Sequence, residues 1–188
     1  MACPWVTIDP MDISARTDYA IRALLMLAQE AQEAQEAQEA QGALGALGSR
    51  GAQGARSEGV PVSAETLAHR QILPRKFLEA ILGDLRRAGI VVSQRGPTGG
   101  YTLSRPAAQI SLGDIFRAVD GPLAEVRGLR PHETSYDGVA EHLPVVWVAV
   151  RASLRRVLDG TSLEQLLTGE LPADVRRLAK DPEAWQNR

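Results

Sequence analysis

Two closely spaced helices between residues 63 and 88 constrain the fold more than any other feature of this sequence. The first is expected over Ala64–Gln71, because the hydroxyl of Ser63 can accept a backbone N–H of its first turn. After a tight two-residue connection, Pro74 suits the first position of the second helix, where its missing N–H is no loss, and Gly89 ends that helix. The pattern predicts a helix-turn-helix, a motif whose second helix can enter the major groove of DNA.

The second helix is amphipathic and begins with basic residues. Its apolar side chains recur at helical spacing and are Phe77, Leu78, Ile81, Leu82 and Leu85. Arg75 and Lys76 fall outside this stripe, in the first turn. The helix is therefore expected to pack its apolar face on the protein and to leave its cationic start exposed.

Two short strands follow, Ile90–Gln94 and Tyr101–Ser104, separated by the sequence RGPTGG. This pattern predicts a β-hairpin with a glycine-rich tip, which after a helix-turn-helix forms the wing of a winged helix. The tip carries one long cation, Arg95, on a backbone slender enough to approach phosphates or a minor groove. A glycine loop can also indicate nucleotide binding, but that fingerprint needs a helix after the loop, and here a strand follows.

The charge distribution is consistent with a polyanion-facing surface in the same region. The chain carries 21 basic and 23 acidic side chains, a formal net charge of -2. Residues 66–105 hold 7 basic but only 2 acidic side chains, a local net charge of +5. Phosphate neutralisation depends on local rather than total charge. A solvated helix face explains the same charges equally well, so charge alone does not decide between the two interpretations.

The N-terminal part combines one apolar helix with a low-complexity insertion. Residues 13–28 carry apolar side chains at helical spacing and predict a largely buried helix. An Ala-Gln-Glu repeat over residues 28–41 favours a solvated continuation of that helix, and the glycine-rich residues 42–59 are expected to form a flexible linker. Residues 1–10 lack a signal-peptide pattern, no segment is apolar enough to span a membrane, and the single cysteine, Cys3, cannot form an intramolecular disulfide. The expected location is the cytoplasm.

The C-terminal half predicts a second apolar surface. Ser111 caps a short helix that reaches about Asp120, and residues 123–143 form an irregular polar stretch of the length of functional loops. Pro144 then opens a helix through Leu158 that is apolar nearly all round in its first half, so a second copy of the same helix is its expected partner. The expected dimer interface consists of Trp147, Val150, Leu154, Val157 and Leu158. Trp147 is interpreted as an anchor of that interface rather than as a platform for a stacked ligand.

Other polar residues carry weaker signals. Thr161 and Glu164 predict a capping box for a last short helix that ends near Thr168. His132 and His142 lie near acidic residues in the loop, but their spacing repeats no known ligand set, so loop polarity is favoured over a metal site. No spacing of Ser, His and Asp, or of paired carboxylates, indicates an enzyme.

Taken in order, these segments resemble the Rrf2 family of bacterial winged-helix transcriptional regulators. The resemblance rests on the sequences MDISARTDYAIRALLMLA, SAETLAHRQ, FLEAILGDLRRAGIV, RGPTGGYTLSRP, ISLGDIFRAVDGP and GTSLEQLL, from Met11 to about Leu167. It implies a homodimer, joined through the long helix after Pro144, that binds a roughly palindromic operator. It also makes Met11 the expected translation start. By position, the residues implied in DNA binding are Pro74, Arg75 and Lys76 at the helix start, and Arg95, Gly96, Thr98, Gly99, Gly100 and Tyr101 in the wing.

The chain departs from the family pattern in two places. Many members hold an iron-sulfur cluster through three cysteines in the loop before the dimerisation helix, and residues 123–142 contain no cysteine, so no cofactor is expected. The effector is then expected to be a small molecule or a protein that the sequence does not identify. The turn carries Ile72 where the family often has glycine, and Pro74 where it often has a capping Ser or Thr. These differences predict that the helix start docks slightly differently.

The sequence therefore predicts a mainly α-helical winged helix-turn-helix with a small β-hairpin and a long C-terminal dimerisation helix. The expected function is sequence-specific binding of double-stranded DNA as a transcriptional regulator, with repression favoured over activation. The alternative is a winged helix that serves as a protein-interaction module, for example on a metabolic enzyme. The expected divisions are a disordered extension (1–10), the first helix (11–28), the low-complexity insertion (29–59), the helix-turn-helix and wing (60–105), a short helix with a sensor-type loop (106–143), the dimerisation and last helices (144–168) and a tail (169–188).

Overall fold

The computed structural model describes residues 13–44 and 59–186, and its longest element is the helix α1, Ala15–Leu44. The first half of α1 is buried at Ala20, Ala23 and Leu24, whereas the Ala-Gln-Glu repeat is mostly exposed. Within the repeat, Gln29 Nε2 donates to Glu33 Oε1 at 2.9 Å, one turn further on. The prediction that the repeat prolongs the first helix is confirmed. Residues 1–10, which include Cys3, and most of the glycine-rich linker lie outside the described residues. The predictions of disorder and flexibility made for them concern those residues.

The helix-turn-helix consists of α2, Ala64–Gln71, and α3, Arg75–Arg87. Ser63 caps α2 as predicted, with its Oγ accepting from Thr66 N at 3.0 Å. Pro74 is the N-cap of α3 rather than its first helical residue, because its ψ of 116° is extended. The prediction was therefore wrong by one residue.

The hairpin consists of β1, Val91–Gln94, and β2, Gly100–Leu103, paired antiparallel with Gln94 opposite Gly100. The strand β1 begins one residue later than predicted, and β2 has the predicted length but begins and ends one residue earlier. Val62 pairs with Tyr101 along the free edge of β2, through N–H···O bonds of 3.0 and 2.9 Å in the two directions. This bridge attaches the segment just before α2 to the hairpin.

Three further helices complete the main part of the chain: α4, Leu112–Val119, α5, Leu143–Leu158, and α6, Leu163–Thr168. Ser111 and Asp114 form the predicted capping box of α4. The predicted box of α6 is displaced by one residue, since Ser162 and Gln165 form it. The Thr161 hydroxyl instead donates to the Val157 carbonyl, at 2.8 Å.

The tail contains a short helix, α7, Ala173–Ala179, and the remaining regular elements are 3₁₀ turns. These turns are η1, Ala107–Gln109, η2, Pro131–Glu133, η3, Gly138–Ala140, and η4, Pro182–Trp185. The turns η2 and η3 lie within the stretch that was predicted to be irregular.

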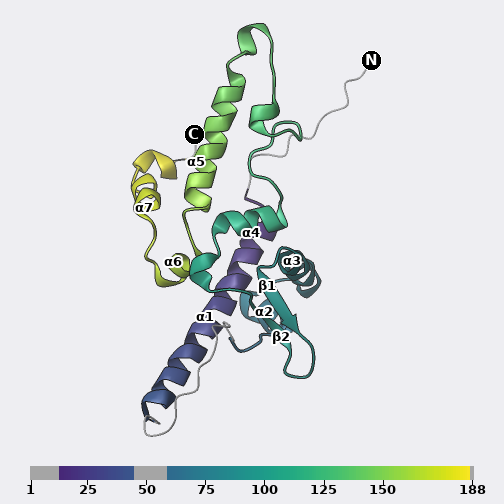
Figure 1. Cartoon of the computed structure of the whole chain (residues 1–188), viewed down its shortest axis with the longest axis vertical. Helices are drawn as coiled ribbons and strands as arrows, with labels where there is room; N and C mark the ends of the chain where they lie inside the picture. The colour runs from purple at the N-terminus through teal and green to yellow at the C-terminus, as the bar shows by residue number, and fades with distance from the viewer. Residues whose placement is uncertain (1–12, 45–58, 187–188) are drawn as a thin grey trace.

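One hydrophobic core joins α1 to the helix-turn-helix, the hairpin, α4 and α6. Its largest fully buried side chains are Leu24, Leu67, Leu78, Ile81, Leu82, Leu85, Ile90, Ile110, Ile115, Leu163 and Val91. In Figure 1, α2, α3 and the hairpin lie on one side of α1, α6 and α7 lie on the other, and α5 projects from one end. The expected mainly helical winged helix is confirmed. Within the described ranges, every helix is too short or too polar to cross a membrane.

The chain resumes at Gly59 close to the point where α1 leaves the core. A Cβ added to Gly59 would lie 2.9 Å from the Cβ of Ala31. The start of the exposed part of α1 and the end of the insertion are therefore neighbours.

Candidate nucleic-acid interface

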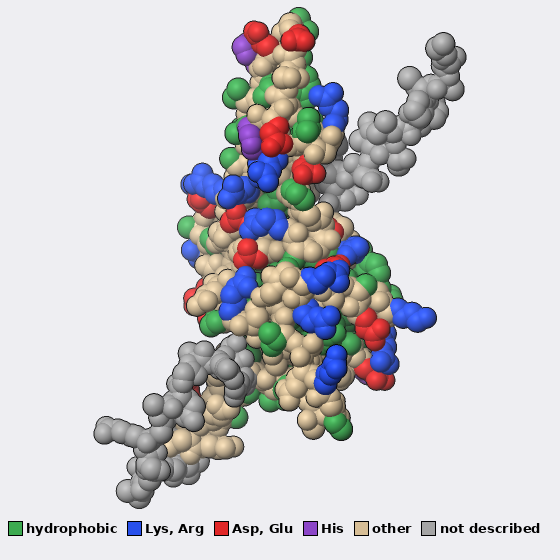
Figure 2. Space-filling view, turned by 45° about the vertical axis from the view of Figure 1, so that its right-hand side comes forward, with side chains coloured by type: hydrophobic (Ala, Val, Ile, Leu, Met, Phe, Trp, Pro, Cys, Tyr) green, Lys and Arg blue, Asp and Glu red, His purple; other side chains and the backbone are tan. Residues whose placement is uncertain are grey.

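The residues predicted to contact DNA lie at the start of α3 and in the hairpin, two elements that follow each other directly in the chain. Both elements lie on the same side of α1 (Figure 1), and Figure 2 shows several Lys and Arg side chains over this side of the molecule, with uncharged surface and a few Asp and Glu side chains between them.

The apolar stripe of α3 attaches the helix to the core. Leu78, Ile81, Leu82 and Leu85 are fully buried, as the helical spacing predicts. Phe77 departs from the pattern, because it remains 38% exposed and its ring packs edge-on against Tyr19 of α1, with centroids 5.8 Å apart. The stripe thus fixes which side of α3 faces away from the protein.

The N-terminus of α3 is open. Pro74 has no side-chain hydrogen bond to offer, and the backbone N–H groups of Arg75 and Lys76 have no acceptor among the described residues. The N-terminal end of a helix carries a partial positive charge and free N–H donors, a combination suited to a phosphate group.

Arg75 is exposed but held by two carboxylates of its own chain. Its Nε donates to Glu79 Oε1 at 2.9 Å, and its Nη1 lies 3.4 Å from Glu65 Oε2 on α2. The hydrogen bond to Glu79, with the negative charges of Glu65 and Glu79, raises the pKa of the Arg75 guanidinium. An Arg75 contact to DNA would have to compete with these carboxylates.

Three of the six other cations in residues 66–105 are also paired. Carboxylate partners within 4.0 Å hold Arg70, Arg87 and Arg105 through Glu30, Asp84 and Asp114, respectively. Three cations of residues 66–105 form no ion pair with a carboxylate of the described part of the chain. They are Lys76, Arg86 and Arg95. The sequence reasoning did not single out Arg86, whose Nη1 donates weakly to Ser93 Oγ at 3.4 Å.

The local backbone geometry explains why glycine occupies three positions of the wing. Gly96 has a φ of +118°, and its carbonyl accepts from Gly99 N at 3.0 Å. A Cβ on Gly99 would overlap the Gln94 carbonyl, and one on Gly100 would lie 2.5 Å from the backbone of Val62. Gly99 and Gly100 therefore shape the wing through close backbone approach.

The remaining predicted wing residues differ in exposure. Arg95, Gly96 and Thr98 are exposed at the tip, whereas Tyr101 is half-buried and packs against the core. The tip is thus where the hairpin can reach a ligand, and Tyr101 anchors its base.

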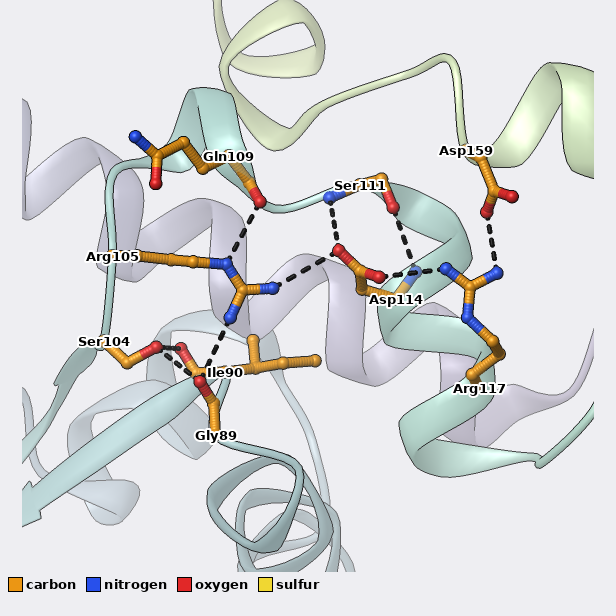
Figure 3. A network of polar contacts seen from close by, with 9 residues as sticks. All are labelled: Gly89, Ile90, Ser104, Arg105, Gln109, Ser111, Asp114, Arg117 and Asp159. Atoms are coloured by element: carbon orange, nitrogen blue, oxygen red, sulfur yellow. Dashed lines mark hydrogen bonds and ion pairs between the residues drawn. The ribbon is translucent and has the colours of Figure 1, made fainter.

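A polar network at the base of the wing was not predicted from the sequence (Figure 3). Arg105, which follows β2, donates to the carbonyls of Gly89 and Gln109, each at 3.1 Å, and lies 3.3 Å from Asp114 Oδ2. Asp114 Oδ1 accepts from Arg117 Nη2 at 2.9 Å. The network joins the end of α3 and the wing to α4.

The network continues to the end of α5. Arg117 Nη1 donates to Asp159 Oδ1 at 2.7 Å, and Arg155 Nε donates to Asp159 Oδ2 at 3.1 Å. Asp159 fits closely over Gly113, where a Cβ would overlap its carboxylate oxygen. The capping role of Asp114 is visible in the sequence, but these long-range partners are not.

Opposite charges in the network shift the pKa values of its members. Burial raises the pKa of Asp114, but hydrogen bonds from Arg117 and Ser111 outweigh this effect and hold the pKa below its usual value. Burial likewise raises the pKa of Asp159, but hydrogen bonds from Arg117 and Arg155 outweigh this effect. The pKa of Asp159 is therefore also below its usual value. Both carboxylates are charged at neutral pH.

The predicted dimer-interface residues lie on α5 and are half-buried within their own chain. They are Trp147, Val150, Leu154, Val157 and Leu158. Three other apolar side chains of α5 are more exposed, Val145 at 71%, Val146 at 50% and Val148 at 44%. Among them, Val145 and Val148 share one side of the helix.

The described residues contain no group of three or more His, Cys, Asp or Glu side chains that could hold a metal ion. His132 Nε2 lies 4.0 Å from Glu133 Oε1, and His142 Nε2 lies 3.4 Å from Glu141 Oε1, each an exposed pair of adjacent residues. The structure therefore does not bring the two histidines of the loop together with a ligand set.

Comparison with known proteins identifies the relatives of this chain. The sequence model of a family described as "Rrf2: Iron-dependent Transcriptional regulator" matches residues 51–169. The HTH-type transcriptional regulator Rv1287 of Mycobacterium tuberculosis is 37% identical over 177 residues, which cover 94% of each chain. The solved structure of CymR, the global cysteine regulator of B. subtilis, has a TM-score of 0.60 and 27% identity, covering 85% of this chain and 98% of that one. The structure of T. potens IscR has a TM-score of 0.56 and 26% identity, covering 95% and 93%.

Proposed function

Because this chain belongs to the Rrf2 family of transcriptional regulators, we propose that it binds a roughly palindromic DNA operator as a homodimer and acts as a repressor. In this proposal α3 enters the major groove and the tip of the wing contacts the minor groove or its phosphates. A protein that works on DNA in this way belongs in the bacterial cytoplasm, as the sequence predicts.

The distribution of unpaired cations carries the proposal. Lys76 at the start of α3 and Arg95 at the tip of the wing are exposed and have no carboxylate partner in the described parts of the chain. Cations that are already paired gain less from a phosphate, because a DNA contact must replace an existing ion pair. Lys76 and Arg95 are therefore the residues that we propose for phosphate or base contacts, with Arg75 as a contact that first has to leave Glu79 and Glu65.

In the proposed complex, the other predicted residues would take three different roles. Pro74 leaves the N-terminal amides of α3 free for a phosphate. Gly96 and Thr98 would approach the DNA with the wing tip, whereas Gly99, Gly100 and Tyr101 would act through the shape of the hairpin.

The second copy in the proposed dimer would pack along α5. A helix with exposed valines at 145, 146 and 148 has apolar surface that its own chain leaves uncovered. We propose that this surface, together with the predicted residues Trp147, Val150, Leu154, Val157 and Leu158, forms the isologous contact.

Iron does not fit this chain in the way that the family description suggests. The whole sequence contains one cysteine, Cys3, and the described loop before α5 offers two histidines in separate pairs. Iron-sulfur clusters are held by several thiolates. We therefore assign no role to such a cluster and propose an effector of another chemical class.

DNA binding is tested with the fragment upstream of the protein's own gene, in gel-shift or fluorescence-anisotropy titrations at several salt concentrations. Lys76→Ala and Arg95→Ala are each expected to weaken binding and to reduce the slope of log K against log salt by about one per lost phosphate contact. Arg177→Ala, which removes an exposed arginine of α7, is the matched control and should change neither quantity.

Two results would contradict the assignment. If neither variant changes binding at any salt concentration, Lys76 and Arg95 are not DNA contacts. If the unchanged protein gives no retardation even at low salt, the protein-interaction alternative gains support instead.

A further inference from the structure

A small pocket of about 340 Å³ lies where α4, the loop after it and α5 meet. Its lining consists of Arg117, Pro122, Leu123, Arg130, Arg151 and Arg155. Four of these six residues are arginines, and none is acidic. The volume is at the low end of the roughly 300 to 1,000 Å³ typical of small-molecule sites, so the pocket suits a compact ligand.

The arginines of this pocket are only partly neutralised. Arg117 and Arg155 share the carboxylate of Asp159, and Arg117 also pairs with Asp114. Arg130 and Arg151 have no carboxylate partner in the described part of the chain. The Nε of Arg151 is buried without any hydrogen-bond acceptor there.

An unpaired guanidinium with a buried N–H is costly, because it has lost water without gaining an acceptor. The group concerned is Arg151, and the other residues that line its pocket include three arginines and no carboxylate. A ligand with several anionic oxygens would supply the missing acceptors, since a guanidinium presents its donors in the fork that carboxylate and phosphate oxygens fit.

We propose that this pocket binds a small polyanion with at least two acidic groups, such as a compact dicarboxylate, tricarboxylate or diphosphate. Arg130 and Arg151 supply the primary contacts, because they are free of competing carboxylates. Pro122 and Leu123 supply the apolar wall against which a short carbon skeleton can lie.

The pocket is connected to the wing by the network of Figure 3. Arg117 belongs to both, and it is linked through Asp114 to Arg105, which donates to the Gly89 carbonyl at the base of the hairpin. An anion that draws Arg117 away from Asp114 would change how firmly Arg105 holds that base. Ligand binding is therefore expected to change the affinity for DNA, a step that rests on the proposed function.

Direct titration tests the site without DNA. Citrate and pyrophosphate are titrated separately into the full-length protein by isothermal calorimetry, at constant pH and with sodium chloride adjusted to constant ionic strength. At least one of them is expected to bind saturably with one site per protomer. Arg130→Gln and Arg151→Gln should each weaken that binding at least about tenfold, as expected for the loss of a charged hydrogen-bonding group.

Arg156→Gln is the matched control, because Arg156 lies on α5 beside Arg155 but pairs with Asp174 outside the pocket. It is expected to change the affinity less than about twofold. Binding of citrate alone, or of pyrophosphate alone, identifies the carboxylate or the phosphate class as the source of the anion. The proposal is wrong if neither anion binds saturably, or if Arg156→Gln weakens binding as much as the pocket variants do.

The effect on DNA is measured separately, so that the two proposals can fail independently. The DNA affinity of the unchanged protein is compared with and without a saturating concentration of the anion that binds, at equal ionic strength. We expect a shift of at least about fivefold that Arg151→Gln abolishes. Failure of the anion-free protein to bind DNA contradicts the proposed function alone, whereas saturable anion binding with unchanged DNA affinity contradicts the coupling alone.

Discussion

At Ile72 the backbone of the turn takes a conformation that suits glycine and not a β-branched residue. Its φ is 54° and its ψ is 49°, in the left-handed region, while its side chain is 92% exposed. The family that the sequence resembles often has glycine here, and from that difference we predicted a changed docking of the helix start, not a left-handed backbone at Ile72. The backbone N–H of Ile72 donates to the carbonyls of Ala68 and His69, the latter at 3.3 Å, which closes the end of α2.

Replacing Ile72 by glycine should stabilise the protein. The left-handed conformation costs a non-glycine residue about 1 to 2 kcal/mol, and glycine gives back roughly 0.5 to 1 kcal/mol through the entropy of the unfolded chain. The expected gain for Ile72→Gly is therefore about 0.5 to 1 kcal/mol in the free energy of unfolding, measured by urea denaturation. Ile72→Ala removes nearly the same side chain but keeps a Cβ, so it should gain less; equal gains for both variants would show that backbone strain is not the cause.

Ion pairs with carboxylates of the same chain decide which basic residues are available to contact DNA. These ion pairs were the least predictable aspect of the candidate site. The sequence indicates that residues 66–105 are net positive, but the carboxylates that neutralise Arg70 and Arg105 come from Glu30 and Asp114, outside that segment. Such pairs depend on the tertiary fold rather than on spacing along one helix. Caps behave differently, because Ser63 and Ser111 act on amides three residues away and could be read from the sequence.

At the scale of elements, the polar network of Asp114, Arg117 and Asp159 joins α4 to the end of α5. The backbone reinforces this junction, because Leu112 N donates to the Thr161 carbonyl at 2.9 Å and Leu163 N donates to the Ile110 carbonyl at 3.0 Å. The position of α5 relative to the winged helix is thus set by both backbone and side-chain bonds.

The contribution of Asp159 should depend on pH in a defined direction. Its pKa in the folded protein is lowered, so its stabilising effect is complete above the pKa of the unfolded chain, near 4, and is lost as the pH falls through the folded-state value. Asp159→Asn is expected to lower the free energy of unfolding by about 1 kcal/mol at pH 7. The difference between variant and parent should shrink as the pH falls below about 4.

Urea denaturation at a series of pH values measures this difference. Asp18→Asn removes an exposed carboxylate that pairs with Arg22 one turn along α1, and it should cost less at pH 7. A difference for Asp159→Asn that persists unchanged at pH 3 would mean that the asparagine acts by packing rather than by loss of charge.

At the scale of the whole molecule, α5 projects from the rest of the chain (Figure 1). Part of its apolar surface is exposed, at Val145, Val146 and Val148. The sequence predicted this helix within one residue and predicted that it is too apolar to stand alone. It did not predict which side its own chain would cover, because that depends on η2, which packs beside α5. Trp147 and Leu154 are half-buried, while Val145 and Val148 remain exposed.

A charge at Val148 should therefore separate the proposed dimer. Val148→Asp is expected to raise the dimer dissociation constant by at least about tenfold, because each copy loses roughly 1.5 kcal/mol or more of apolar burial. Analytical ultracentrifugation over a range of protein concentrations measures this change. Val60→Asp places the same charge at a valine that is 59% exposed and lies before α2, and it should leave the oligomeric state as it was. Identical sedimentation of the parent and both variants would exclude this side of α5 from the contact.

The closeness of Gly59 to Ala31 has a consequence for how such a chain can change over time. Because the departing and returning backbones already touch, an excursion between them can grow or be trimmed without moving any buried residue. The closure entropy of such a loop rises only by about 0.6 kcal/mol for each doubling of its length. The same spot is a natural site for grafting a foreign polypeptide, such as a reporter, into an otherwise intact regulator.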